Sequence, residues 1–219
     1  MALYGGPPCQ AYSTIGRGSN KAKKSTDKRV YLYKHYLDFL NKYNPKFFLF
    51  ENVKGLLSFK DLKGKLLLPQ IIREFNKCGY KVEYKLVDAS EYGVVQKRER
   101  LILVGYRKDL TINDSFFDHL DKYKEVAPTI RELFEDLPAI KSGKESNKYR
   151  CNSSSKFIEK YIRNKEDILT QHIARMHNEN DLEIYELVLK AKKNGKNLRY
   201  IDIPEKLQTH SNKTSFLDR

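Results

Sequence analysis

The sequence predicts an α/β fold, because segments with the character of strands alternate with segments of helical periodicity. The strand candidates are short apolar stretches, at 2–4, 47–50, 82–86 and 101–106. The helix candidates carry apolar residues at helical spacing, at 27–43 and 66–78. This alternation is typical of a layered sheet with helices packed on it. We expect the sheet in residues 1–110 and a smaller, irregular, basic region in residues 111–219.

The two predicted helices have recognisable ends. Asp27 can cap the first, and Asn44-Pro45 ends it because the residue before a proline disfavours helical backbone. Helical spacing predicts a buried face made of Val30, Tyr33, Leu37 and Leu40. Gly79 can cap the second helix, and Pro69 fits there if it lies in the first turn.

The strand candidates differ in their expected burial. Residues 47–50 form an unbroken apolar run, which predicts a strand that is covered on both faces and ends before Glu51. Val82, Tyr84 and Leu86 alternate with other residues, which predicts a strand with one buried face.

One regular helix is predicted in the second region. It should begin after Asn178 or Asn180 and close at Gly195. Its apolar stripe is predicted to consist of Leu182, Tyr185 and Val188 or Leu189. Two histidines precede it, His172 and His177, but they lie five positions apart and do not share a helical face, so we expect no metal site there.

The composition favours a folded protein with a polyanionic partner. Lys and Arg number 42 against 28 Asp and Glu, and nucleic acid is the usual partner of such a positive excess. Aromatic residues make up 12% of the chain, which favours a folded chain over a disordered basic tail. Without an 18-residue apolar stretch or a signal-peptide pattern, we expect a cytoplasmic protein that does not enter a membrane. Three cysteines without a CxxC pair argue against a disulfide framework and a zinc site.

The segment Gly5-Gly6-Pro7-Pro8-Cys9-Gln10 places flexible and rigid residue types around one thiol. Glycine permits a close backbone approach and proline fixes φ, so the segment predicts a stiff turn that orients Cys9. An inert cysteine in an ordinary loop is the alternative. Cys9 follows one predicted strand and Glu51 follows another, and ligands bind beyond the carboxyl ends of strands in open α/β sheets. We therefore expect the two side chains to reach the same crevice.

A third polar segment, 96–100, leads directly into the strand at 101–106. If side chains already alternate between the two faces of the strand in the residues before 101, then Gln96, Arg98 and Arg100 share one face. A charged run of this kind is usually a solvated edge. A thiol, a carboxylate and an arginine pair at successive strand ends together indicate a reaction site instead.

These three segments resemble, in order and spacing, motifs of the DNA cytosine-5 methyltransferases. The similar motifs are the catalytic loop (Gly5 to Gln10, with Ser13), ENV (Glu51-Asn52-Val53) and QxRxR (Gln96-x-Arg98-x-Arg100). The resemblance implies a partial, Rossmann-like S-adenosylmethionine-dependent methyltransferase sheet in residues 1–110 and a target-recognition region in 111–219. It also implies S-adenosylmethionine as the cofactor, double-stranded DNA as the partner and no metal.

The resemblance further implies a role for each site residue. Cys9 would attack carbon 6 of a cytosine flipped out of the duplex, and Glu51 would bind N3 of the same base. Arg100 would stabilise the O2 carbonyl, as an oxyanion-hole donor does, while Arg98 braces the site. Contacts to DNA would come from Gln10, Ser13 and Gln96. Arg175 would add a contact, because residues 171–178 resemble a stretch of the target-recognition region of some members; a helix entry whose histidines cap and pack is the alternative for that stretch. Pro8 would contact the cofactor.

Members of this family also carry a glycine-rich loop and a closing helix that complete the cofactor site, and residues 1–219 show neither pattern. Val95 stands where the family usually has proline. We therefore expect a fragment or one subunit of a bacterial-type restriction–modification enzyme, associated with the nucleoid. In the subunit case a second polypeptide supplies the remaining motifs. The alternative is a non-catalytic DNA-binding subunit or an inactive remnant. A thiol hydrolase would need a histidine near Cys9, which the sequence lacks.

Overall fold

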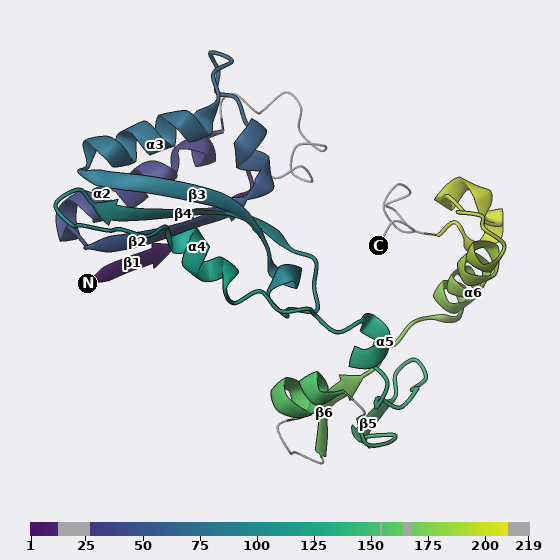
Figure 1. Ribbon diagram of the computed structural model, residues 1–219. Coiled ribbons are helices and arrows are strands. Elements are labelled where there is room, and N and C mark those ends of the chain that lie inside the picture. The colour runs from purple at the N-terminus through teal and green to yellow at the C-terminus, as the bar shows by residue number, and fades with distance from the viewer. Residues whose placement is uncertain (13–26, 154, 164–167, 210–219) are drawn as a thin grey trace. The chain divides into compact units, whose positions relative to one another are not determined.

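The structure, a computed structural model, describes residues 1–12, 27–153, 155–163 and 168–209 (Figure 1). The chain divides into two compact units, Met1–Ile130 and Arg131–Arg219. The boundary falls after residue 130 rather than after residue 110, because the intervening residues include a short helix that is bonded to the sheet of the first unit.

The first unit is built on a four-stranded sheet. Its strands, in chain order, are β1 (Ala2–Gly5), β2 (Phe47–Val53), β3 (Tyr80–Asp88) and β4 (Glu99–Arg107). Across the sheet the order is β1-β2-β4-β3, with β1 and β2 parallel and β4 antiparallel to both of its neighbours. The predicted α/β sheet is confirmed. Because β4 runs antiparallel, its first residues lie at the same edge as the last residues of β2.

Two helices pack on one face of this sheet, α2 (Tyr33–Tyr43) and α3 (Leu67–Lys77). Asp27 caps a single 3-10 turn, Lys28–Tyr31, after which α2 begins and continues to a left-handed Asn44. The predicted buried face is confirmed, since the buried residues include Val30, Tyr33, Leu37 and Leu40. In α3, Pro69 lies in the first turn, where its missing N–H is not needed, and Gly79 follows with φ +90°.

Aromatic rings fill the space between these helices and the sheet. Tyr36 of α2 contacts the rings of Phe48 and Phe50 edge-on, with centroids 5.8 and 5.2 Å apart. Phe75 of α3 packs on the same two rings. On β4, Gly105 faces Phe48 so closely that a Cβ atom would stand 2.0 Å from the ring, so glycine is required at this position. The packing of the core therefore depends on large aromatic rings and on Gly105, which leaves room for the Phe48 ring.

The two faces of β2 differ, which corrects the prediction of a strand that is covered on both sides. Phe48 and Phe50 are fully buried against α2 and α3, whereas Phe47 is 41% exposed and Leu49 is half-buried. Both helices pack on the face that carries Phe48 and Phe50, so the alternate residues face away from them. The strand also continues through Val53, so Glu51 lies within it rather than after it.

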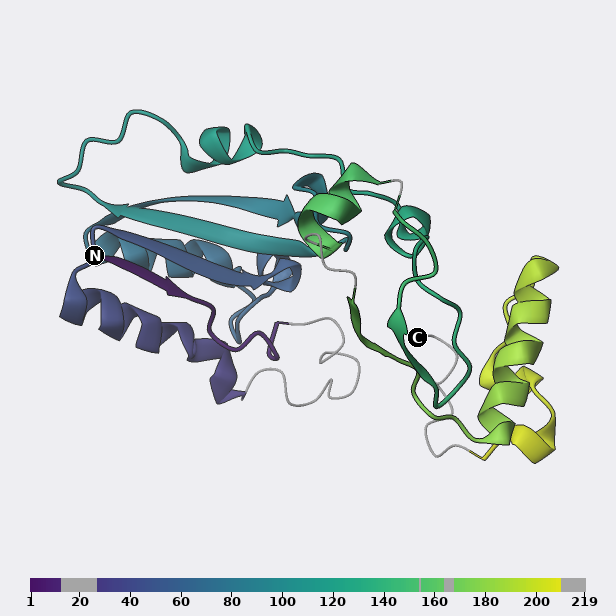
Figure 2. The same cartoon turned by 90° about the horizontal axis from the view of Figure 1, so that it is seen from below.

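A short helix, α4 (Phe116–Asp121), lies on the opposite face of the sheet from α2 (Figure 2). Glu83 of β3 accepts hydrogen bonds from the Ser115 hydroxyl at 2.6 Å and from the Phe116 N–H at 2.8 Å. At the other end of α4, Asp121 forms an ion pair with Lys85 at 2.5 Å. These contacts fasten residues after 110 to the first unit.

The second unit contains a two-stranded antiparallel sheet and one long helix. Its elements are α5, which begins at the boundary (Ile130–Leu133), β5 (Glu145–Lys148), a π-helical turn (Ile158–Arg163), β6 (Ile168–Ile173), α6 (Glu179–Lys193) and two 3-10 turns (Tyr200–Asp202 and Glu205–Leu207). Arg163 is buried beside Asp136 and lies over the ring of Tyr149, 4.1 Å from its centroid.

The buried face of α6 shares only Val188 with the predicted stripe. Asn178 caps the helix by accepting the Asp181 N–H at 2.8 Å, as one of the two predicted caps. Ile184, Leu187 and Val188 pack against the turns that follow, whereas Leu182, Tyr185 and Leu189 are exposed. Both sets have helical spacing, so periodicity alone could not choose between them. In the part of the chain that the structure describes, no helix is long and apolar enough to cross a membrane.

Candidate active site

The loop that follows β1 is held against the end of β2. A Cβ atom on Gly6 would stand 2.8 Å from Oε2 of Glu51 and 3.1 Å from its carbonyl oxygen. A side chain at this position would displace the Glu51 carboxylate and move the loop slightly away from β2, so glycine allows the loop its close approach. The amide nitrogen of Asn52 donates a 3.5 Å hydrogen bond to the carbonyl oxygen of Pro7. The first half of the loop is thus fixed against Glu51 and Asn52.

Tyr12 anchors the far end of the loop. Its N–H donates to the carbonyl oxygen of Cys9 at 2.9 Å, which closes a turn. The Tyr12 ring is fully buried, packs edge-on against Phe59 with centroids 5.1 Å apart, and donates its hydroxyl to the Val30 carbonyl. Burial raises the pKa of the Tyr12 phenol, which therefore stays a neutral donor. Cys9, half-buried, lies between these two fixed points.

Glu51 and Arg100 form an ion pair beside this loop. The Arg100 Nε lies 2.7 Å from the Glu51 Oε1, and both side chains remain partly accessible. Val53 is the register partner of Arg100, and Glu51 is the partner of Ile102, so the two charged residues are diagonal neighbours on one face. That face is opposite the one that packs on α2 and α3. The antiparallel direction of β4 is what makes this pairing geometrically feasible.

Two further contacts fix the position of Arg100. Its Nη1 donates to the carbonyl oxygen of Glu99 at 2.8 Å. The Glu99 carboxylate in turn accepts bonds from Lys54 at 2.9 Å, which joins the start of β4 to the residue after β2. Arg100 is therefore held by its own strand as well as by Glu51.

Arg98 and Gln96 lie outside β4, so the predicted shared face of Gln96, Arg98 and Arg100 is wrong. The strand begins at Glu99, and the alternation of side chains does not extend to the residues before it. Both side chains are exposed. The backbone of Arg98 is fixed, because its N–H donates to Asp88 at 3.2 Å and its carbonyl accepts from Ala89 at 3.1 Å.

The other predicted residues of this unit lie on the loop. Pro8 and Gln10 are exposed, on either side of Cys9. The Gln10 Oε1 accepts a hydrogen bond from the Arg29 guanidinium at 2.8 Å. Ser13 lies outside the described residues. The structure thus brings Glu51 and Arg100 together, with the Cys9 loop in contact with Glu51 through Gly6.

Sequence reasoning placed Gly6 in a stiff turn without identifying its neighbour, and it assigned no separate role to Asn52, although both residues hold the loop. Asn52 is fully buried, and its Oδ1 accepts the Val53 N–H at 2.9 Å while its Nδ2 reaches Pro7. A buried amide within an apolar strand was the available signal, because such a group must find hydrogen-bond partners. The glycine at position 6 signalled a close approach, but its partner, Glu51, lies 45 residues away in the sequence and could not be read from the local pattern.

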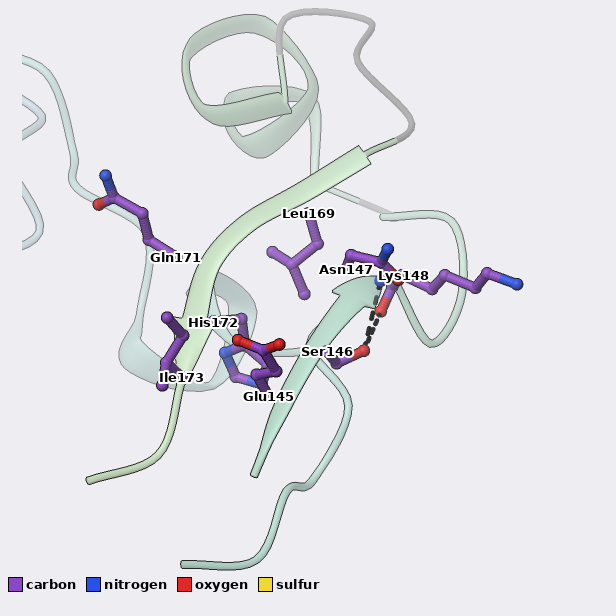
Figure 3. Close-up of a pocket in the computed structure, with 8 residues that line it drawn as sticks. All are labelled: Glu145, Ser146, Asn147, Lys148, Leu169, Gln171, His172 and Ile173. Atoms are coloured by element: carbon purple, nitrogen blue, oxygen red, sulfur yellow. Dashed lines mark hydrogen bonds between the residues drawn. The ribbon is translucent and has the colours of Figure 1, made fainter. Parts of the chain in front are cut away.

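The second unit holds Arg175 and a shallow pocket of about 420 Å³ on the two-stranded sheet (Figure 3). The pocket is lined by Glu145, Ser146, Asn147, Lys148, Leu169, Gln171, His172 and Ile173. Arg175 is exposed, and its carbonyl accepts a bond from Ser142 at 3.2 Å. His172 is bonded to the Pro138 carbonyl at 2.8 Å. Among the described residues, no group of three or more His, Cys, Asp or Glu side chains could hold a metal ion.

Comparison with known proteins identifies the family of this chain. The family model "C-5 cytosine-specific DNA methylase" matches residues 2–216. The Type II methyltransferase M.Bpa9945I of Bacillus paralicheniformis is 33% identical over 99% of this chain and 52% of its own length. The Type II methyltransferase M.FnuDI of Fusobacterium nucleatum is 40% identical over 67% of this chain and 40% of its length.

A solved structure agrees with the sequence comparison. It is described as a DNA modification methyltransferase encoded within an E. coli prophage, and it matches with a TM-score of 0.52 and 26% identity, over 73% of this chain and 43% of that one. The chain thus spans about half of the length of the first curated relative and less of the second. With a family model that covers nearly all of its residues, the chain belongs to the C-5 cytosine-specific DNA methylase family.

Proposed function

We propose that the chain carries the base-reacting half of a DNA cytosine-5 methyltransferase of a restriction–modification system. The observation that carries the proposal is the 2.7 Å contact between Glu51 and Arg100 beside the Cys9 loop. N3 and O2 are neighbouring atoms of cytosine, so a carboxyl group and a guanidinium side by side can bind both at once. The relatives that bear the name Type II methyltransferase support the restriction–modification assignment.

In the proposed mechanism, Cys9 activates carbon 5 of a cytosine that has left the duplex. The Cys9 thiolate forms a bond to carbon 6, and the displaced electron pair moves through carbons 5 and 4 to N3, where Glu51 supplies a proton. Arg100 stabilises the charge at O2. After carbon 5 is methylated, N3 returns its proton to Glu51. Solvent water then takes the proton from carbon 5, which restores the double bond between carbons 5 and 6 and expels the Cys9 thiolate.

The described residues fit one side of a site for S-adenosylmethionine. Pro7 and Pro8 present a rigid, uncharged surface next to the thiol, and such a surface does not repel a sulfonium cation. When bound, S-adenosylmethionine supplies the methyl group. Pro8 is the residue of this chain that we assign to that contact. The second unit, with Arg175 and the lysines on and beside β5, is assigned to duplex DNA. The enzyme would therefore be associated with the nucleoid, where that DNA lies.

Covalent trapping tests the proposed function. The full-length natural protein is incubated with S-adenosylmethionine and a duplex in which 5-fluorocytosine replaces the target base. Fluorine cannot leave carbon 5 as a cation, so the covalent adduct with the thiol should persist and survive denaturation. A duplex with unmodified cytosine should give no lasting adduct. A non-catalytic DNA-binding subunit would retain both duplexes and form no adduct. That outcome would contradict the proposal.

A second prediction concerns cofactor binding by residues 1–219 alone. The chain spans about half of the first relative's length, and we propose that residues outside it, on the same or a second polypeptide, complete the cofactor site. The 219-residue chain should therefore show no saturable binding of S-adenosylmethionine at micromolar concentration in calorimetry, because most of the contacts are absent. Addition of the completing segment should restore binding. Tight binding by the chain alone would contradict this division of the site.

A further inference from the structure

Gln10, the residue after Cys9, is joined by a chain of hydrogen bonds to the 3-10 turn that precedes α2. Arg29 lies in the 3-10 turn that precedes α2, and its Nη1 donates to the Gln10 Oε1 at 2.8 Å. The other side of the guanidinium is occupied by the Asp27 carboxylate. Nε lies 2.9 Å from Oδ1, and Nη2 lies 2.7 Å from Oδ2. Gln10 is thus connected through Arg29 to a carboxylate.

Asp27 is itself fixed by the backbone. Its Oδ1 accepts the Arg29 N–H at 3.0 Å and caps the turn. The bonds from Arg29 lower the pKa of the Asp27 carboxyl, so the group stays ionised at neutral pH. One residue further on, the Val30 carbonyl accepts the Tyr12 hydroxyl, which holds the turn against the loop. A planar guanidinium that is paired along one edge with a fixed carboxylate has little freedom to rotate.

This geometry determines which way the Gln10 amide faces. A guanidinium has five N–H donors and no acceptor, so the amide oxygen of Gln10 must point toward Arg29. The amide NH₂ group then points away from Arg29. Because the side chain of Gln10 is exposed, those donors are available to a ligand that binds over Cys9.

We propose that Arg29 is a positioning residue that presents Gln10 to DNA as a hydrogen-bond donor, and this inference rests on the proposed function. The complementary group is an acceptor oxygen of the duplex. Two oxygens are suitable: a backbone phosphate beside the target, or O6 of the guanine that loses its cytosine partner. Arg29 would act through Gln10 and would not need to touch the DNA itself.

A double-mutant cycle tests this coupling. The rate of adduct formation on 5-fluorocytosine DNA is measured at saturating DNA for the wild type, Gln10→Ala, Arg29→Ala and the double variant. Each single variant should be slower by about tenfold, since a misplaced contact next to the reacting base slows the reaction step. The double variant should be no slower than Gln10→Ala. If the rate reductions of the two single variants multiplied in the double variant, Arg29 would act independently of Gln10, and the proposal would be contradicted.

Two controls separate positioning from charge. Lys28→Ala removes a neighbouring exposed cation from the same turn and should leave the saturated rate unchanged. Arg29→Lys keeps the charge but cannot bind Asp27 and Gln10 at once, so it should resemble Arg29→Ala. DNA affinity and its salt dependence should stay close to wild type for Arg29→Ala. A variant that loses affinity while its saturated rate is preserved would identify Arg29 as a phosphate contact instead.

Modified duplexes identify the acceptor oxygen. Replacing the guanine opposite the target by 2-aminopurine removes O6, and a methylphosphonate removes the charge of one backbone phosphate. The Gln10→Ala variant should lose its defect on the duplex that lacks its acceptor. If the defect of Gln10→Ala persists on every such duplex, Gln10 is not a donor to DNA. That result contradicts the inference about Arg29 and leaves the proposed function unaffected. Absence of any adduct with the wild type would instead contradict the proposed function and the role of Arg29 with it.

Discussion

Replacing Cys9 by serine is expected to lower methyl transfer by at least about four orders of magnitude, because a serine hydroxyl carries almost no anion at neutral pH. The substitution changes one half-buried atom on a loop that Gly6, Asn52 and Tyr12 hold in place. The thermal unfolding temperature and the dissociation constant for duplex DNA should therefore stay close to wild type. Initial rates of methyl incorporation and equilibrium DNA binding measure the two effects.

Cys78 provides the matched control for this prediction. It is also a half-buried cysteine of the first unit, but it lies at the end of α3, where burial raises the pKa of its thiol. Cys78→Ser should keep wild-type turnover. Turnover that survives in Cys9→Ser, or is lost in Cys78→Ser, would show that the nucleophile has been assigned to the wrong residue.

Replacing Arg100 by alanine is expected to reduce turnover by about two orders of magnitude, as for a lost oxyanion-hole donor. The loss should be in the reaction step, because Arg100 pairs with Glu51 beside the loop and contributes a small share of the phosphate neutralisation that dominates DNA affinity. Single-turnover methylation at saturating DNA measures the rate. DNA affinity over a range of salt concentrations measures the binding.

A lysine of the second unit gives the contrasting case for Arg100. Lys148 is exposed on β5, and Lys148→Ala should weaken binding to all sequences and lower the salt slope by about one unit if it contacts a phosphate. Its single-turnover rate at saturating DNA should be unchanged. If Arg100→Ala behaved in the same way as Lys148→Ala, the segment 96–100 would be a phosphate-binding edge and not part of the reaction site.

Local pattern was sufficient to predict the four strands and the two long helices of the first unit, but not the short helix α4. The N-terminal cap at Asp27, the buried face of α2 and the strands that begin near Phe47 and Tyr80 depend on residues close together in the sequence. The motifs then placed Cys9, Glu51 and Arg100 near strand ends, although their chemical roles are still predictions. The local pattern could not show the direction of each strand, because apolar residues alternate in the same way in parallel and antiparallel strands.

The features that sequence reasoning missed all depend on distant neighbours. The contact of Glu51 with Arg100 requires β4 to lie antiparallel beside β2, and the glycine at position 6 is explained by a carboxylate that the fold brings to it. The bond between Gln10 and Arg29 joins residues 19 positions apart. On α6, two apolar stripes compete, and the turns near Tyr200 decide which of them is buried. Such choices belong to tertiary packing rather than to local propensity.

The most direct test of the central claim is to map the covalent adduct on 5-fluorocytosine DNA by mass spectrometry. After nuclease and protease digestion, the peptide that carries the nucleotide remnant should contain Cys9, and fragmentation should place the added mass on that residue. Peptides that contain Cys78 or Cys151 should appear without it. An adduct on either of those cysteines, or an unmodified Cys9 peptide in a reaction that methylates normal DNA, would contradict the assignment of Cys9 as the nucleophile.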